Sequence, residues 1–311
     1  NVRYTNVTTL TDLPAGLKWL NCGGLDITSL PNALPAGLGS LICVYSELNT
    51  LPSTLPSTLL HLDASGNALT STGPLPASLR YLDLASNDLV SMQEIPADLV
   101  ELRLQSNSLT TLPPLPSGLV ILHAVDNTLT SLPALPASLQ ILALSYNELV
   151  TLPELPASLI ELYTPSNQLT SLPALPNALR KLSTMANELT SLPDLPDSLR
   201  FLHATYNQLT SIPELPDSLL LFGCSGNQIT ELPALPAGLQ ELYCNANPIA
   251  CLPALPNSLI DLVTSATEIT CLPNIPTNAV LNTADLGFAP IICVEDRIGR
   301  DVGQAGEIGR A

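Results

Sequence analysis

The amino-acid sequence predicts a solenoid. Short parallel strands would form a sheet on its concave face, extended segments would return over its convex face, and few or no helices are expected. Two observations predict this class. Asparagine recurs every 20 residues from Asn67 to Asn247 without a slip, and Leu-Pro pairs recur with the same period. A fixed period of this length is the signature of stacked structural repeats.

The proline content supports order rather than disorder. The chain of 311 residues contains 30 prolines, but 46% of its residues are hydrophobic. Disordered low-complexity segments do not combine apolar richness with prolines at a constant spacing. The prolines therefore belong to the repeated architecture.

Each unit has the form L-P-x-L-P-x-x-L-x-x-L-x-x-x-x-N-x-L-x-x, which is a leucine-rich repeat. Around Leu142 and Leu144 the pattern alternates with period 2, so a short strand there points both leucines inward and Ile141 and Ala143 outward. Neighbouring units would stack as parallel strands about 4.8 Å apart. One unit cannot cover its own leucines, so stacking must supply the core.

The asparagine of each unit lies at the end of the predicted strand, where the chain must turn. Its amide can donate and accept, so we expect it to satisfy buried backbone groups of adjacent turns rather than to touch a ligand. The predicted ladder comprises Asn67, Asn87, Asn107, Asn127, Asn147, Asn167, Asn187, Asn207, Asn227 and Asn247.

Paired prolines such as Pro133 and Pro136 remove backbone donors and disfavour helix interiors. They suit an extended or polyproline-II return path. With 20 residues in a turn there is also little room for a long helix.

The ends of the array are irregular, as expected of capping units. We predict an N-terminal cap over residues 1–16, about 13 repeats over 17–274, a C-terminal cap over 275–294 and a tail or linker over 295–311. The asparagine position holds Leu25 and Ser46 in the first units and Thr267 in the last. Because the chain starts at Asn1 without methionine or a leader, we interpret it as a mature protein or a fragment.

The charge excludes some partner classes. The formal net charge is -17, from 27 acidic and 10 basic residues. Nucleic acids and anionic membrane surfaces are bound through Lys and Arg, so both are disfavoured. No uninterrupted apolar run reaches about 18 residues, so no membrane insertion is expected.

The string LPxLPxxLxxLxxxxNxLxxLP, repeated from about Leu51 to Leu272, resembles the repeat domain of secreted bacterial effectors of the YopM and IpaH type. The resemblance implies a horseshoe or superhelical solenoid. IpaH-type proteins also carry a helical ubiquitin-ligase domain, whereas only a short tail follows the repeats here, so ligase activity is not carried over. Four units depart from those effectors and resemble surface and secreted proteins of environmental bacteria, because their inward strand position holds Cys22, Cys43, Cys224 or Cys244.

Aromatic, histidine and charged residues gather at the outward strand positions of the C-terminal half. Exposed aromatic side chains on a rigid face are candidate interface anchors, although they could equally pack across neighbouring strands. The predicted concave patch comprises Glu161, Tyr163, Lys181, Met185, Phe201, His203, Tyr206, Glu241 and Tyr243.

Two further groups of residues suggest metal or covalent chemistry. Asp63 and Asp83 should be neighbours on adjacent strands, which makes them a weak calcium candidate or a solvated acidic face. A disulfide among Cys251, Cys271 and Cys293 would staple the C-terminal end and imply an oxidising compartment. No cofactor is expected.

The sequence favours a non-catalytic recognition module of an exported bacterial protein, secreted or at the cell surface, that binds protein or glycan on its concave sheet. An open sheet lacks the enclosed pocket that catalysis requires. One alternative is a structural surface, adhesin or filament component that self-associates. A further alternative is a host-directed secreted effector.

Overall fold

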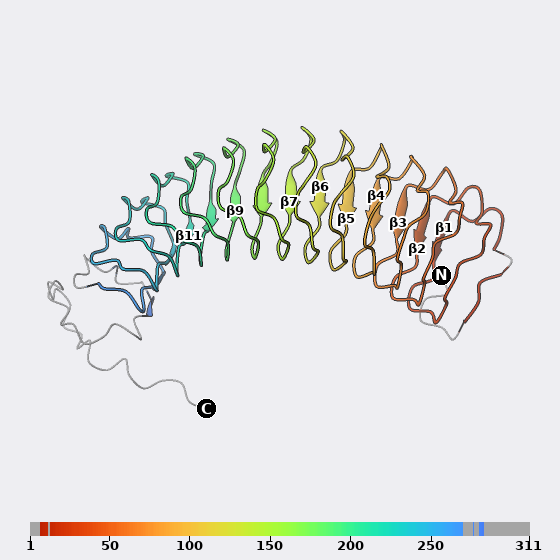
Figure 1. Cartoon of the computed structure of the whole chain (residues 1–311), viewed down its shortest axis with the longest axis horizontal. Helices are drawn as coiled ribbons and strands as arrows, with labels where there is room; N and C mark the ends of the chain where they lie inside the picture. The colour runs from red at the N-terminus through yellow and green to blue at the C-terminus, as the bar shows by residue number, and fades with distance from the viewer. Residues whose placement is uncertain (1–6, 12, 270–275, 277–279, 283–311) are drawn as a thin grey trace, which may run out of the picture.

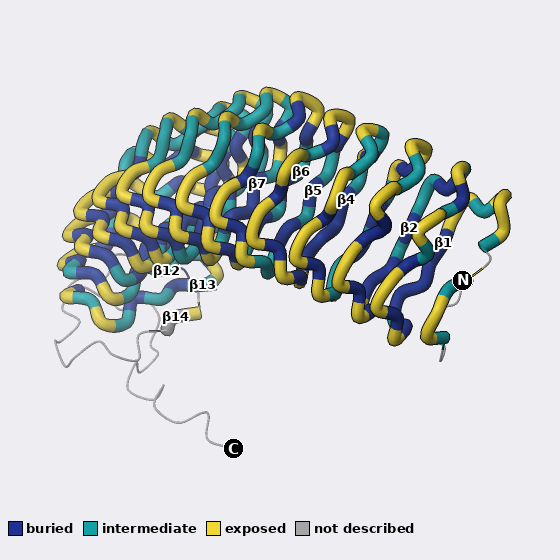
Figure 2. The backbone as a smooth tube through the Cα atoms, turned by 45° about the vertical axis from the view of Figure 1, so that its right-hand side comes forward, coloured by how far each residue is buried: buried dark blue, intermediate teal, exposed yellow. Residues whose placement is uncertain are grey.

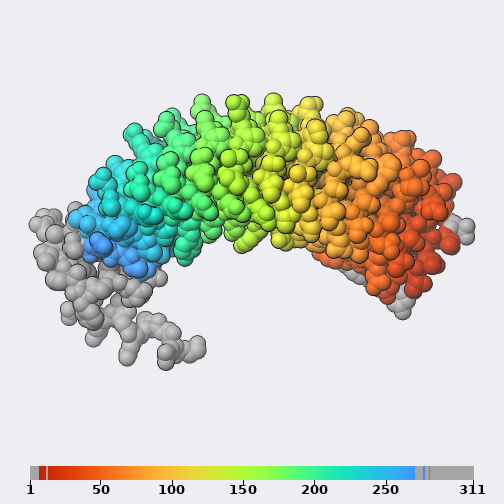
Figure 3. Space-filling model, viewed as in Figure 1, coloured from red at the N-terminus to blue at the C-terminus, as the bar shows by residue number. Residues whose placement is uncertain are grey.

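The computed structural model describes residues 7–11, 13–269, 276 and 280–282. It forms one 14-stranded sheet whose strands lie in chain order. Every neighbouring pair is parallel. The turns stand side by side along an arch (Figure 1) and pack into one continuous body (Figure 3). The predicted parallel solenoid is confirmed, and the described residues contain no helix.

Each strand has three residues. The strands are β1 Trp19–Asn21, β2 Ser40–Ile42, β3 His61–Asp63, β4 Tyr81–Asp83, β5 Glu101–Arg103, β6 Ile121–His123, β7 Ile141–Ala143, β8 Glu161–Tyr163, β9 Lys181–Ser183, β10 Phe201–His203, β11 Leu221–Gly223, β12 Glu241–Tyr243, β13 Asp261–Val263 and β14 Val280–Asn282.

The structure describes parts of both predicted caps. Val7, Leu10 and Leu13, within the predicted N-terminal cap, pack against the buried core. β14 lies inside the segment 275–294 that the sequence predicts as a C-terminal cap, so the sheet runs one strand beyond the expected repeats. The rest of that segment, apart from residue 276, and the tail 295–311 lie outside the described residues.

The core is a column of leucines that runs through all the turns. The middle residue of each strand from β1 to β13 is buried, and it is leucine everywhere except Phe222. The leucine three residues before it, such as Leu139, and the one two residues after the asparagine, such as Leu149, are fully buried as well. Buried residues therefore recur at the same place in every turn, and exposed ones lie at the outer bends (Figure 2). Burying each leucine side chain stabilises the stacked turns by about 1.5 to 3 kcal/mol.

The asparagine side chains bridge adjacent turns. Asn147 accepts a hydrogen bond from the backbone N–H of Leu129 at 3.0 Å and donates to the backbone oxygen of Ala124 at 2.9 Å, both in the preceding turn. It also donates to the oxygen of Leu144 at 3.0 Å, within its own turn. All ten asparagines accept from and donate to the preceding turn in this way.

The irregular units replace this bridge with weaker contacts. Ser46 donates from its hydroxyl to the backbone oxygen of Cys22 at 3.4 Å. Thr267 donates to Thr264 at 2.7 Å, which lies in its own turn. A hydroxyl has one donor where an amide has two, so these terminal turns are less firmly joined than the central ones.

A second set of side chains, here called the serine ladder, joins the turns on the return path, and it was not predicted from the sequence. The hydroxyl of Ser138 donates to the backbone oxygen of Leu119, one turn earlier, at 2.6 Å. The signal was a serine or threonine directly before the leucine that follows each second Leu-Pro pair. The members are Thr58, Ser78, Ser138, Ser158, Ser198, Ser218 and Ser258.

The residue before each asparagine adopts a left-handed conformation. Its φ is 57° at Tyr146, 52° at Ala186 and 64° at Gly226. Glycine is the residue that takes this conformation without strain. At Gly226 it has a second use, because a Cβ there would lie 2.5 Å from Cδ1 of Tyr206, whose ring covers it from the preceding turn.

We predict that Asn147→Ala lowers the free energy of unfolding by about 1 to 3 kcal/mol, because backbone groups of two buried turns lose their partners. Urea denaturation followed by circular dichroism measures the change. Asn177→Ala is the control, because Asn177 is exposed on the return path. An unchanged unfolding midpoint for Asn147→Ala would show that the asparagine side chain does not contribute to the free energy of unfolding.

We predict that Gly226→Ala lowers the free energy of unfolding by about 1 to 2 kcal/mol, because alanine is strained at positive φ and its Cβ meets the Tyr206 ring. In a Tyr206→Ala background the cost should fall, because only the backbone strain remains. The same denaturation experiment on all four proteins gives the coupling between the two positions. Equal costs in both backgrounds would show that the ring contact contributes nothing.

Candidate recognition surface on the sheet

The first and third residues of each strand flank its buried middle residue and form the side of the sheet that faces away from the leucine core, here called the sheet face. The third residue is itself buried in β1, β4, β7 and β11. Five residues of the predicted patch lie on three adjacent strands: Glu161 and Tyr163 on β8, Lys181 on β9, and Phe201 and His203 on β10. All five are partly buried. They therefore form one contiguous area that is held by its neighbours and still accessible.

The remaining patch residues lie further apart. Met185 follows β9 and is partly buried, whereas Tyr206 lies beyond β10 at the left-handed position and is 61% exposed. Tyr243 on β12 is separated from His203 by β11, where Gly223 occupies the third strand position. The patch is thus continuous over β8 to β10 and interrupted at β11.

A hydrogen-bonded ion pair organises the sheet face at β8 and β9. The Nζ of Lys181 lies 2.9 Å from Oε1 of Glu161, and the hydroxyl of Tyr163 donates to Oε2 of the same carboxylate at 2.7 Å. Burial alone would raise the pKa of Glu161, but the hydrogen bonds from Lys181 and Tyr163 outweigh it and hold the pKa below its ordinary value. Burial, followed by the bond to Glu161, raises the pKa of Tyr163.

The same strand sequence, Glu-Leu-Tyr, recurs at β12 with a different neighbour. The hydroxyl of Tyr243 lies 2.7 Å from Oε2 of Glu241 and 3.0 Å from Oδ2 of Asp261. Glu241 and Asp261 are register partners on β12 and β13. Burial, followed by the bonds to the two carboxylates, raises the pKa of the Tyr243 hydroxyl.

A third cluster covers the sheet face at β3 to β5. The rings of His61 and Tyr81 stack with centroids 4.3 Å apart and planes 8° from parallel. The guanidinium of Arg103 lies 5.9 Å from the Tyr81 ring centroid, and its Nε lies 2.7 Å from Oε1 of Glu101. Aromatic stacking and cation–π contact hold these side chains against the sheet.

The calcium candidate consists of two carboxylates on adjacent strands. Asp63 and Asp83 are register partners, as expected. Each carboxylate already accepts hydrogen bonds near its own strand, Asp63 from Ser65 and Asp83 from Ala85 and Tyr81. Among the residues that the structure describes, no three or more His, Cys, Asp or Glu side chains are placed to share a metal ion. Burial raises the pKa of Asp83.

The cysteines fall into two classes. Cys251 is disulfide-bonded, while Cys271 and Cys293, the other two cysteines of the predicted staple, lie outside the described residues. The four inward cysteines of the repeats are buried free thiols, and burial raises the pKa of each. A thiol that stays protonated is a poor nucleophile and metal ligand. These four cysteines are Cys22, Cys43, Cys224 and Cys244.

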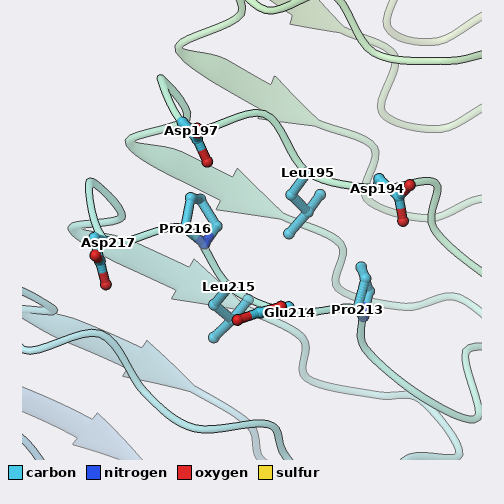
Figure 4. A pocket seen from close by; sticks show the side chains of 8 residues that line it. All are labelled: Asp194, Leu195, Asp197, Pro213, Glu214, Leu215, Pro216 and Asp217. Carbon is cyan, nitrogen blue, oxygen red and sulfur yellow. The ribbon is translucent and has the colours of Figure 1, made fainter.

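An acidic hollow lies on the return path, away from the strands (Figure 4). Asp194, Asp197, Glu214 and Asp217 line it together with prolines and leucines of two neighbouring turns. This hollow was not predicted from the sequence. Its signal in the sequence is that the segments LPDLPD and IPELPD have aspartate or glutamate at the positions where the LPALPA segment of an earlier unit has alanine.

No protein-family model and no curated protein sequence matches the chain. Solved structures do match it. YopM from Yersinia enterocolitica is 39% identical over 89% of this chain and 62% of its own, with a TM-score of 0.87. YopM from Yersinia pestis, a leucine-rich effector protein, is 32% identical over 86% of this chain and 88% of its own, with a TM-score of 0.65.

A third solved structure shares the fold alone. The Arabidopsis receptor kinase HAESA, in complex with the peptide hormone IDA and a co-receptor, is 21% identical over 82% of this chain and 50% of its own, with a TM-score of 0.58. The present chain spans 62% of the Yersinia enterocolitica YopM chain. Together, the 20-residue unit, the parallel solenoid and these identities show that the chain belongs to the YopM family of bacterial leucine-rich-repeat proteins.

Proposed function

We propose that the chain is the recognition module of a secreted, host-directed bacterial effector and that it binds a protein on its sheet face. The observation that carries this proposal is the contiguous, partly buried group of Tyr163, Lys181, Phe201 and His203 on β8 to β10. Tyrosine and phenylalanine on a rigid surface bury large areas and lose little conformational entropy on binding. The solenoid supplies that rigidity.

Membership in the YopM family supports the effector over a surface, adhesin or filament component, because the Yersinia pestis relative is an effector protein. Secretion and entry into host cells are part of this proposal. HAESA, which shares the fold, was solved in complex with a peptide hormone, and the ligand proposed here is likewise a protein or peptide.

The proposed role is non-catalytic. The inward cysteines are buried, and burial raises the pKa of their thiols. The sheet face is open, whereas catalytic groups are usually enclosed where water is excluded. Binding energy would then come from the aromatic anchors and from the charged groups around them.

We predict that Tyr163→Ala combined with Phe201→Ala weakens partner binding by about 30-fold to 700-fold, because each truncation of an interface anchor costs about 1 to 2 kcal/mol. Proteins retained from host-cell lysate by the wild-type chain are identified by mass spectrometry. The affinity of one such purified partner for each variant is then measured by calorimetry. The circular-dichroism spectrum should stay unchanged, because both side chains lie outside the leucine core.

The matched control is Glu154→Ala with Gln168→Ala, two exposed residues off the sheet face. This variant should bind the purified partner with wild-type affinity. A partner that binds the Tyr163 and Phe201 variant as tightly as wild type would show that the two rings serve cross-strand packing.

A further inference from the structure

Three strands of the sheet begin with glutamate, and they present the same carboxylate position to the sheet face. These are Glu101 on β5, Glu161 on β8 and Glu241 on β12. Glu101 pairs with Arg103 at 2.7 Å, and Glu161 pairs with Lys181 at 2.9 Å. Within the described part of the chain, Glu241 has no such cation. Its register partner is the carboxylate of Asp261.

The unit at β8 and β9 is an internal template for the unit at β12 and β13. Both first strands read Glu-Leu-Tyr, and both tyrosine hydroxyls lie 2.7 Å from the glutamate Oε2. In the first unit the lysine of the next strand occupies the register position beside the glutamate. In the second unit an aspartate occupies it. The repeat therefore shows which group this glutamate and tyrosine hold when one is supplied, namely an alkyl ammonium ion.

The hydrogen bonding at β12 and β13 is incomplete without a further donor. One phenolic proton of Tyr243 faces two carboxylates, at 2.7 and 3.0 Å. A hydroxyl donates one hydrogen bond, so only one of these contacts is satisfied by it. Two negative charges on opposing cross-strand positions also repel each other. A positive donor between Glu241 and Asp261 removes both problems.

Apolar surface lies beside these carboxylates. Val280 on β14 is the register partner of Asp261 and is 67% exposed. The methylene stem of a lysine or arginine packs on apolar side chains while its charged end reaches a polar group. The combination of two carboxylates, a hydroxyl and an exposed valine fits such a side chain.

We propose that Glu241, Tyr243 and Asp261 form a pocket on the sheet face for a lysine or arginine side chain of the bound protein. This proposal rests on the proposed recognition function and names the chemistry of the partner. The cation takes the place that Lys181 takes beside Glu161 and Tyr163, and the chain's net charge of -17 attracts a cationic partner over a longer range.

The test uses a dye-labelled tetralysine amide as the probe and follows its fluorescence anisotropy at an ionic strength of about 0.15 M, where exposed charges further apart than about 8 Å are largely screened. Asp261→Lys supplies the missing cation within the chain, so tetralysine should bind about tenfold more weakly than to wild type. Glu241→Gln, which keeps the shape of the side chain, should also weaken binding. A tetra-acetyllysine peptide, which lacks the charges, should not bind.

The matched control for charge is Glu188→Lys, which makes the same change in net charge at an exposed position off the sheet face. It should alter the affinity for tetralysine by less than about twofold, because exposed charges act weakly at a distance. Equal losses in Asp261→Lys and Glu188→Lys, or no tetralysine binding by the wild-type chain, would overturn the pocket.

A second test creates the proposed site at β8 and β9 instead of removing it at β12 and β13. Lys181→Asp turns the unit at β8 and β9 into a copy of the unit at β12 and β13, so the chain should gain a second tetralysine site in a calorimetric titration. An unchanged stoichiometry in a variant with the wild-type circular-dichroism spectrum would overturn the template argument.

Failure of the pocket is distinguishable from failure of the recognition function. A purified partner that loses affinity for the Tyr163 and Phe201 variant, but binds Asp261→Lys as it binds wild type, removes the pocket and leaves the function standing. A partner unaffected by either variant removes both.

Discussion

The ten regular turns of the fold share one constraint, which is the amide of the asparagine that each of them contains. That amide lies beside the leucine core and satisfies backbone groups of its own turn and of the turn before it, as Asn147 does with Leu129, Ala124 and Leu144. Because its partners are fixed backbone atoms, it sets the length of the turn, the left-handed residue that precedes it and the register of the strands. A rigid sheet with a constant spacing follows from this constraint.

Much of this architecture could be predicted from the sequence, because period 20 and period 2 determine which residues face the core. The strand at Ile141–Ala143 and the position of every ladder asparagine follow from the spacing. The strand β14 was missed because the step from Asp261 to Val280 is 19 residues and the repeat signature has faded there. The serine ladder was missed because serine is also common at positions where it only meets solvent.

For the candidate surface, the sequence predicts which residues occupy the outward strand positions, but it does not predict the contacts between their side chains. Periodicity places Tyr163 and Glu161 on one face, but it does not say that the hydroxyl reaches the carboxylate, which depends on rotamers and neighbouring strands. The repeated backbone is therefore the same in each turn, while the side chains at the variable strand positions and their contacts differ from turn to turn.

The constant turn has a consequence for how such a protein changes over generations. The junctions between the ten asparagine-containing turns share the same leucine and asparagine positions, so a gene duplication or deletion of one whole unit among them leaves the core and the asparagine ladder intact. It would nevertheless shift every later side chain on the sheet by about 4.8 Å, one strand spacing, relative to the earlier ones. The number of units between them therefore sets the distance between the cluster on β3 to β5 and the patch on β8 to β10.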